Sequence, residues 1–471
     1  MNVFRQHRTG CRARRLGLSQ LLCPGRHTVT GLLCTCGRQF VDWSGDYRLF
    51  SKDRWNVRDL FAPIVEGILA LLPAEVPFLA ALDDTHLPKT GTKIPGVAYR
   101  RDPLSPTFHV NFIRAQRYLQ MSGLLLAGVP PGPARAIPIR YEHVPPVPKP
   151  KKSAPPDVWD AYRQQRREQN LSTAAVRALH DVRQDLDNRH DAPSRQFVVS
   201  VDGSYTNRTV LKALPERTTL IGRIRRDAEL FHPPRAEDQP AVGSKRRYGQ
   251  AAPTPEQLRQ DETAQWQEVT AFAAGKLHTF RVKTIVPVLW KKAGPDRPLR
   301  LVVIAPVRYR PRQNAKLLYR QPAYLICTDP ALPLEQLVQY YLWRWDIEVN
   351  HRDEKQLVGV GEAQVWSADS VDRQPALAVA SYAILLLAGE RAFGAAPTEG
   401  ALPLPKWRQK RPGERLSTLE LIRQLRREVW AYAIDRSCDD SDHFVATDAP
   451  ATKWPESQYP VASALLYATA G

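Results

Sequence analysis

The sequence predicts an α/β fold, because short apolar runs alternate with helix-like segments along it. Residues 78–82 and 197–201 are apolar runs of strand length, and each leads straight into aspartate, at Asp83-Asp84 and at Asp202. A helix-like segment at 205–213 and another strand candidate at 219–224 follow. This alternation of strand, helix and strand is typical of sheets that are covered by helices.

A chain of 471 residues exceeds the usual size of one hydrophobic core, so we expect two or three structural units. The expected units are an N-terminal helical region (1–75), a first part of the α/β core (76–226), an inserted β-rich subdomain (227–330), further core helices (331–393) and a C-terminal helix with a tail (394–471).

The N-terminal region carries helix-like patterning at 27–33 and 59–72. Both a small DNA-binding unit and a plain packing role fit this pattern. After the strand at 78–82, two more strand candidates follow at 108–120 and 136–140. These strands indicate a meander at the start of the core.

A Pro- and Lys-rich segment at 144–156 follows the meander and should be extended and exposed. It fits a linker, and it also fits a segment that lies along a phosphate backbone. Residues 157–187 then predict a charged helix or a pair of helices.

Region 227–330 begins polar and basic and then becomes rich in strand-like runs, at 277–289, 299–309 and 317–327. The helical period returns at residue 334 and holds to about residue 358, where Gly359 and Gly361 predict the exit from the helix.

The chain is strongly basic, with 67 Lys and Arg against 48 Asp and Glu, a formal net charge of +19 and a pI of about 9.8. This charge indicates a polyanionic partner, foremost nucleic acid. An anionic lipid surface, or a protein that is merely basic and soluble, stays open.

The sequence predicts a cytoplasmic protein without a membrane span. Six cysteines without regular spacing favour free thiols in a reducing compartment. The basic N-terminus precedes no apolar stretch of signal-peptide length. The most apolar run, 375–389, is shorter than the roughly 20 residues that cross a bilayer, so we expect a buried helix there.

The strongest chemical signal lies in the helix expected at 334–358. Tyr341, Arg344, Glu348 and Lys355 have the spacing Tyr-x2-Arg-x3-Glu-x6-Lys there. At 100° per residue these positions share a stripe of helix surface roughly 60° wide. A carboxylate flanked by a guanidinium and an ammonium suits a metal ligand beside groups that hold phosphates.

The alternative for this helix is a solvated, charged face on which Arg344 pairs with Glu348, as is common at i,i+4 spacing. The nearby Asp346, Asp353 and Glu354 fall off the stripe, and we expect them to be solvated.

With its two aspartates, the motif makes the chain resemble the DDE transposases of bacterial insertion sequences, in the group marked by Tyr-x2-Arg-x3-Glu-x6-Lys. Leu82-Asp83-Asp84-Thr85 resembles the context of the family's first aspartate, and Val201-Asp202-Gly203 that of its second. The stretches KTG, RRDP, FHVNF and QRYLQ look like the branch often labelled seven-oh-one-like. The resemblance covers most of residues 27–390.

The resemblance implies an RNase H-like core with a β-rich insertion between the second aspartate and the glutamate. It implies Asp84 as the first catalytic carboxylate, with Asp83 as the alternative, together with Asp202 and Glu348. Three such carboxylates can hold two Mg²⁺ ions, with Mn²⁺ as a substitute.

DNA contacts are expected from the motif helix and from the GRIRR segment, which resembles a basic stretch that approaches DNA in the family. The residues expected to hold DNA are Tyr341, Arg344, Lys355, Arg223, Arg225 and Arg226. A tryptophan of the insertion holds a flipped base in some members, and Trp290 is the nearest candidate.

The predicted activity is metal-dependent cleavage of transposon ends and strand transfer into target DNA, with a homodimer that brings two double-stranded ends together. Two alternatives stay open. One is a non-catalytic DNA-binding protein derived from such an enzyme, and the other is an RNase H-like nuclease that cuts without joining.

Overall fold

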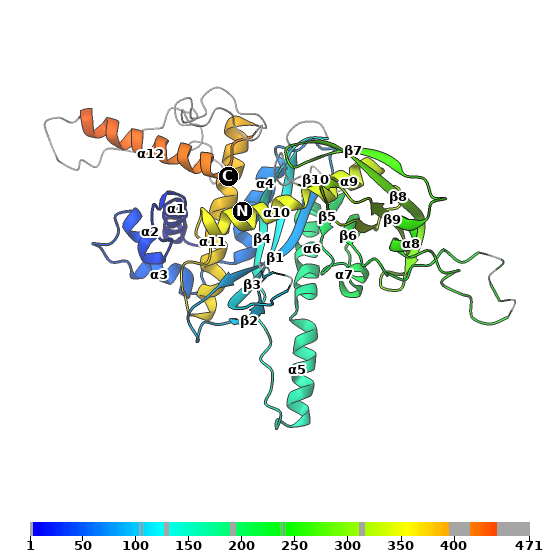
Figure 1. Cartoon of the computed structure of the whole chain (residues 1–471). Coiled ribbons are helices and arrows are strands. Elements are labelled where there is room, and N and C mark those ends of the chain that lie inside the picture. Colours follow the sequence, from blue (N-terminus) through cyan, green and yellow to red (C-terminus); the bar gives the residue numbers. More distant parts are fainter. Residues whose placement is uncertain are drawn as a thin grey trace.

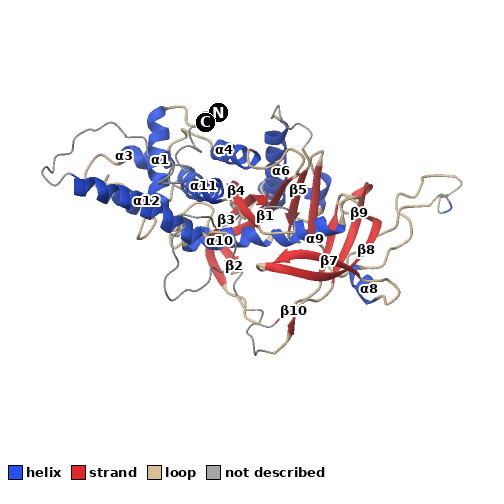
Figure 2. Cartoon of the chain, turned by 90° about the horizontal axis from the view of Figure 1, so that it is seen from above, coloured by secondary structure: helices blue, strands red, loops and turns tan. Residues whose placement is uncertain are grey.

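The computed structural model describes residues 3–439, apart from 103–104, 107, 127–130, 189–194, 236, 238, 241, 310–315 and 395–414. Much of the region expected as a C-terminal helix and tail, 394–471, therefore lies outside the described residues. In the described part, a mixed sheet is flanked by helices, so the predicted α/β class is confirmed (Figures 1 and 2).

The described residues form a ten-stranded sheet, in the order β2-β3-β1-β5-β6-β12-β9-β8-β7, with β4 paired to β3. Its strands are β1 (Phe78–Pro88), β2 (Ala98–Arg101), β3 (Phe112–Leu126), β4 (Ala134–His143), β5 (Phe197–Val201), β6 (Thr218–Arg223), β7 (Gln267–Ala273), β8 (Lys276–Trp290), β9 (Gly294–Ile304) and β12 (Ala323–Cys327). β10 (Arg308–Tyr309) and β11 (Leu318–Tyr319) form a separate ribbon.

Helices of the described residues cover this sheet, and one of them, α5 (Pro156–Glu168), projects away from it (Figures 1 and 2). They are α1 (His7–Leu22), α2 (Val29–Thr35), α3 (Ser44–Ser51), α4 (Val57–Leu69), α5 (Pro156–Glu168), α6 (Leu171–Asp187), α7 (Arg208–Lys212), α8 (Pro255–Gln260), α9 (Leu334–Trp343), α10 (Trp345–Gln356), α11 (Ala368–Phe393) and α12 (Thr418–Asp439).

The centre of the sheet is covered on both faces, as β5 illustrates. All five residues of this strand are buried, and successive side chains point to opposite faces. Val198 packs in a cluster with Leu337 of α9, whereas Val199 packs in the cluster that includes Leu179 of α6. Burial on both faces explains why this strand reads as a continuous apolar run.

The predicted buried helix is confirmed as part of α11. It is the one helix among the described residues that is long and apolar enough to cross a membrane, but 78% of its most apolar window is buried inside the fold. Helices α1, α3, α4 and α12 all pack against it. The N-terminal helices therefore contribute to the core, with Leu16, Phe61 and Ile68 fully buried.

The strands expected in 227–330 do not form a sheet of their own. β12 pairs antiparallel with β6 of the central sheet, and β9, β8 and β7 continue from it. The insertion thus lengthens the central sheet at one side, which Figure 1 shows as the green strands.

Several expected boundaries were wrong, and two of them concern the candidate site residues. β1 does not stop at Asp83 but runs on to Pro88, because it pairs along its length with the long strand β3. The helix expected at 334–358 is divided at Arg344 into α9 and α10, although Arg344 itself keeps helical backbone angles of φ −51° and ψ −31°.

Candidate active site

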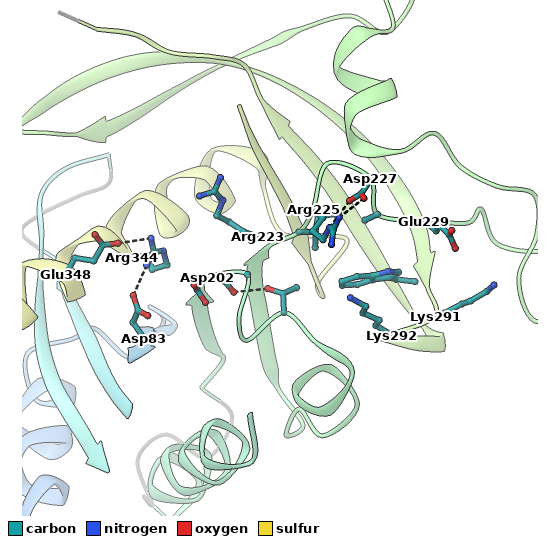
Figure 3. Close-up of a pocket in the computed structure, with 15 residues that line it drawn as sticks. Asp83, Asp202, Arg223, Arg225, Asp227, Glu229, Lys291, Lys292, Arg344 and Glu348 are labelled. Carbon is teal, nitrogen blue, oxygen red and sulfur yellow. Dashed lines mark hydrogen bonds and ion pairs between the residues drawn. The ribbon is translucent and has the colours of Figure 1, made fainter. Parts of the chain in front are cut away.

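An open cavity of about 710 Å³ lies where β5 and β6 end, against α9 and α10. The side chains that line it come from the central sheet, from the motif helices and from the turn between β8 and β9 (Figure 3). Its lining residues are Asp83, Asp202, Gly203, Thr206, Arg223, Ile224, Arg225, Asp227, Ala228, Glu229, Trp290, Lys291, Lys292, Arg344 and Glu348.

Asp83 and Asp202 reach the cavity from neighbouring parallel strands. The register pairs Leu82 of β1 with Val201 of β5, so the two aspartates that follow stand level with each other. Residues at the same level of adjacent strands point to the same face of a sheet. The two carboxylates therefore belong to one face, the face that α9 and α10 cover.

Asp202 is held by the turn that follows β5. The backbone N–H of Ser204 donates to Asp202 Oδ1 at 2.8 Å, and the Ser204 hydroxyl donates to Oδ2 at 3.3 Å. A side chain that accepts from the backbone two residues ahead fixes its own turn. The carboxylate is thus positioned locally, next to Gly203.

Glu348 comes from α10, and Arg344 connects it to Asp83. The Arg344 guanidinium donates through Nη2 to Glu348 Oε1 at 3.0 Å and through Nη1 to Asp83 Oδ2 at 3.3 Å. Figure 3 shows the guanidinium between the two carboxylates. Arg344 is thus the counter-charge of both acids in this structure.

The environment of Asp83 is unfavourable for a bare negative charge. Burial raises the pKa of Asp83 to about 7, Arg344 opposes this shift, and the charge of Asp202 adds to it. A cation supplied from outside would remove this penalty.

Asp84, the expected first carboxylate, points away from the cavity. Because successive residues of a strand face opposite sides, it turns to the face opposite Asp83. Its Oδ1 accepts from the Tyr205 hydroxyl at 3.1 Å, and its Oδ2 lies 3.1 Å from Nε of Arg117. Burial raises the pKa of Asp84, while Arg117 and Tyr205 lower it. Asp83 rather than Asp84 is therefore grouped with Asp202 and Glu348.

The four motif residues are only partly brought together. Tyr341 lies beside Arg344, whose guanidinium carbon is 6.0 Å from the ring centre. Lys355 is not among the described residues that line the cavity, since it lies two turns of helix beyond Glu348. Its charge acts on His86 and His351 instead.

The expectation that the acids near Glu348 are solvated was wrong. Asp353 is 5% exposed and Glu354 is 1% exposed. Asp346 is largely shielded from solvent, and its Oδ1 lies 3.4 Å from Nη2 of Arg415. Glu354 accepts from Nε2 of Gln120 at 2.9 Å, and burial raises its pKa to about 8. Glu354 thus faces β3 of the sheet, whereas Asp353 and Asp346 pair with Arg352 and Arg415.

The basic residues expected near the site follow β6. Arg223 and Arg225 line the cavity, and Arg226 lines a neighbouring hollow that also includes Arg223. Both oxygens of Asp227 accept from Arg225, at 2.9 and 2.8 Å, so this cation is already paired.

Trp290, Lys291 and Lys292 form the opposite wall of the cavity. The Lys292 ammonium lies 4.7 Å from the centre of the Trp290 ring, which is 6% exposed. Trp290 was predicted from the sequence, whereas the two lysines were not. Two consecutive lysines in the turn between long strands were the available signal.

The donor set suits hard divalent cations, because carboxylate oxygens are the ligands that Mg²⁺ prefers. Among the described residues, however, no three Asp, Glu, His or Cys side chains are close enough to form a metal-binding group as they stand. The Arg344 guanidinium lies between two of the acids. Asp83, Asp202 and Glu348 are the residues that could hold metal once Arg344 withdraws.

No protein-family model and no curated protein matches the chain. The cavity, the motif and the charge of the protein are therefore the features that indicate its function.

Proposed function

We propose that the protein is a DDE-type DNA transposase, which cuts DNA ends and joins them to a second DNA. One observation carries this proposal: Asp83, Asp202 and Glu348, from two parallel strands and a helix more than 140 residues further on, line a single cavity. The high positive charge of the chain supports a DNA substrate.

An RNase H-like core is part of the proposal. It is supported by the order β4-β3-β1-β5-β6, in which β1, β5 and β6 are parallel and β3 is antiparallel to β1 and β4. Five strands in this order and these directions, with one acid within the first strand along the chain and another directly after the fourth, are what such a core requires.

Asp83, Asp202 and Glu348 are proposed as the ligands of two Mg²⁺ ions, which Mn²⁺ can replace. The bound metal would activate the attacking oxygen and stabilise the leaving 3′ oxygen. The chain itself would orient the phosphate. Arg223, Lys291 and Lys292 suit that task, because these three cations line the same cavity as the acids.

Arg344 has two roles in this proposal. Without metal it neutralises Asp83 and Glu348, and with DNA bound its guanidinium would pair with a phosphate oxygen instead. Tyr341 would keep the guanidinium in place by lying against it. Lys355, Arg225 and Arg226 are kept as DNA contacts away from the reacting phosphate.

The proposed partners are double-stranded transposon ends and target DNA, bound by a homodimer in the cytoplasm. Burial of α11 within the fold supports a protein that works outside the membrane. A non-catalytic DNA-binding protein and a nuclease that cuts without joining are the alternatives, and the products of the reaction separate them.

The test is an assay on DNA that carries the repeats flanking the coding sequence, with Mg²⁺ or with a chelator. We expect the wild type to yield cut ends and joined products only with metal, and Glu348→Gln to bind this DNA but lose cutting by about 10³-fold. Cut ends without joined products would make the protein a nuclease. Binding of this DNA without cutting in Mg²⁺ or Mn²⁺ would contradict the proposal that the protein is an enzyme.

A further inference from the structure

Between β4 and α6 the chain leaves the body of the protein as a projecting arm. We call residues 144–170 the basic arm; it consists of an extended limb, 144–155, and the helix α5. Figure 1 shows α5 directed away from the rest of the protein. None of the residues of α5, all of which the structure describes, is buried.

Both ends of the basic arm lie at the edge of the sheet that carries the catalytic acids. At the first end, the N–H of Val144 donates to the carbonyl of Arg117 at 2.8 Å, and Arg117 pairs with Asp84. At the second end, Asn207, five residues after Asp202, donates to the hydroxyl of Ser172 at 2.9 Å. The arm therefore projects from the same end of β1 and β5 at which Asp83 and Asp202 lie.

The side chains of α5 are divided by charge. At 100° per residue, a stripe about 140° wide collects the aromatic and basic residues of the helix, and the acids at 157 and 168 fall well outside it. The third acid, Asp160, lies about 20° beyond the edge of the stripe and pairs with Arg163 at 2.5 Å. The stripe contains Tyr162, Arg166, Trp159, Arg163 and Arg167.

The extended limb adds its own cations to this stripe. The Lys149 ammonium lies 6.0 Å from the centre of the Trp159 ring, which also makes an edge contact with Tyr162 at 5.8 Å. Lys151 and Lys152 follow close behind in the sequence and are exposed. Aromatic residues interleaved with Lys and Arg are typical of surfaces that bind nucleic acid.

We propose that the basic arm binds the backbone of the DNA duplex beside the cavity, and so holds the DNA that flanks the cleavage site. This inference rests on the proposed function. A helix of 13 residues without buried contacts is marginal in water, so a partner must supply its stabilisation. The helix is about 20 Å long, enough to follow one strand over about six nucleotides at 3.4 Å each.

The residues of the stripe favour DNA, rather than a second copy of this chain, as the partner that the arm binds. Interfaces between copies are apolar at their centre, whereas this stripe carries three arginines next to its aromatic rings. Its charge complements phosphate, and each phosphate contact releases condensed counterions.

The test uses the whole protein and a labelled 40-base-pair duplex of arbitrary sequence, with affinity measured over a range of salt concentrations. The variant Arg163→Gln/Arg166→Gln/Arg167→Gln should bind at least about tenfold more weakly, and its salt slope should fall by up to about 3, one for each lost contact. Gln164→Ala/Gln165→Ala, on the same helix outside the stripe, is the control and should bind as the wild type does. Since α5 buries nothing, all variants should keep the wild-type Tm.

The other possible results distinguish failure of the basic arm as a DNA-binding element from failure of the proposed transposase function. If the arginine variant keeps the wild-type affinity and salt slope, the basic arm does not bind DNA, whatever the cavity does. If the variant changes the oligomeric state instead, the arm contacts a second copy and the inference is overturned. If the wild type itself shows no salt-dependent binding to the duplex, the proposed function fails together with the arm.

Discussion

Asp83→Asn is expected to reduce metal-dependent DNA cleavage by about 10³-fold or more, whereas Asp84→Asn should keep it within about tenfold of wild type. The reason is that successive side chains of a strand point to opposite faces of the sheet. Asp83 faces Asp202 and α10, while Asp84 faces Tyr205 and Arg117 on the other side of the sheet. The measurement is the rate of single-strand cutting at saturating DNA.

The two variants are each other's control, because they make the same change at adjacent positions. Asp84→Asn should act on stability instead, by about 1–3 kcal/mol, since it leaves the partly buried Arg117 with a weaker partner. Loss of cutting in Asp84→Asn, with normal cutting in Asp83→Asn, would reverse the assignment of the first carboxylate.

Glu354→Gln is expected to stabilise the protein at pH 8.5 by on the order of a few kcal/mol while leaving it nearly unchanged at pH 4.5. Burial raises the pKa of Glu354 from its ordinary 4.5 to about 8. Between these two values the unfolded chain releases the proton and the folded chain keeps it, so the free energy of unfolding falls as the pH rises. A neutral glutamine keeps the acceptor for Gln120 and removes this loss.

Urea unfolding of both proteins at pH 4.5 and pH 8.5 measures this effect. The pKa of Asp83 is also raised, and Asp83 therefore lowers the free energy of unfolding at high pH in both proteins. Its effect cancels when Glu354→Gln is compared with the wild type. Asp157→Asn, at an exposed acid of the arm, is the matched control. Its free energy of unfolding should differ from that of the wild type by the same amount at both pH values. An equal difference at both pH values for Glu354→Gln would show that Glu354 is ionised in the fold.

Elements that depend on local pattern could be predicted from the sequence. The apolar run of β5 and the buried part of α11 were predicted close to their observed bounds, and the helix or helix pair predicted at 157–187 is the pair α5 and α6. In each case burial or exposure follows from the residues of the segment itself. Asp202 could be placed at a strand end for the same reason.

Features that depend on distant parts of the chain could not be predicted. The face to which Asp83 points is decided by α10, and the extent of β1 is decided by its pairing with β3. Glu354 looks like a solvated charge in its helix. It is buried in the fold against Gln120, which lies 234 residues away in the sequence, so its burial could not be predicted from its own segment. The helices α1 and α3 were not distinguished within the N-terminal region, since their buried faces are defined by α11.

The most direct test of the account maps the metal site itself. Fe²⁺ that replaces Mg²⁺ in the protein, with ascorbate and peroxide, produces radicals that cut the chain next to the ion. A metal site built from the three acids predicts cuts near residues 83, 202 and 348, suppressed by excess Mg²⁺ and lost in Asp202→Asn. Cuts elsewhere in the chain, or cuts at these places that persist unchanged in Asp202→Asn, would contradict a metal site built from the three acids.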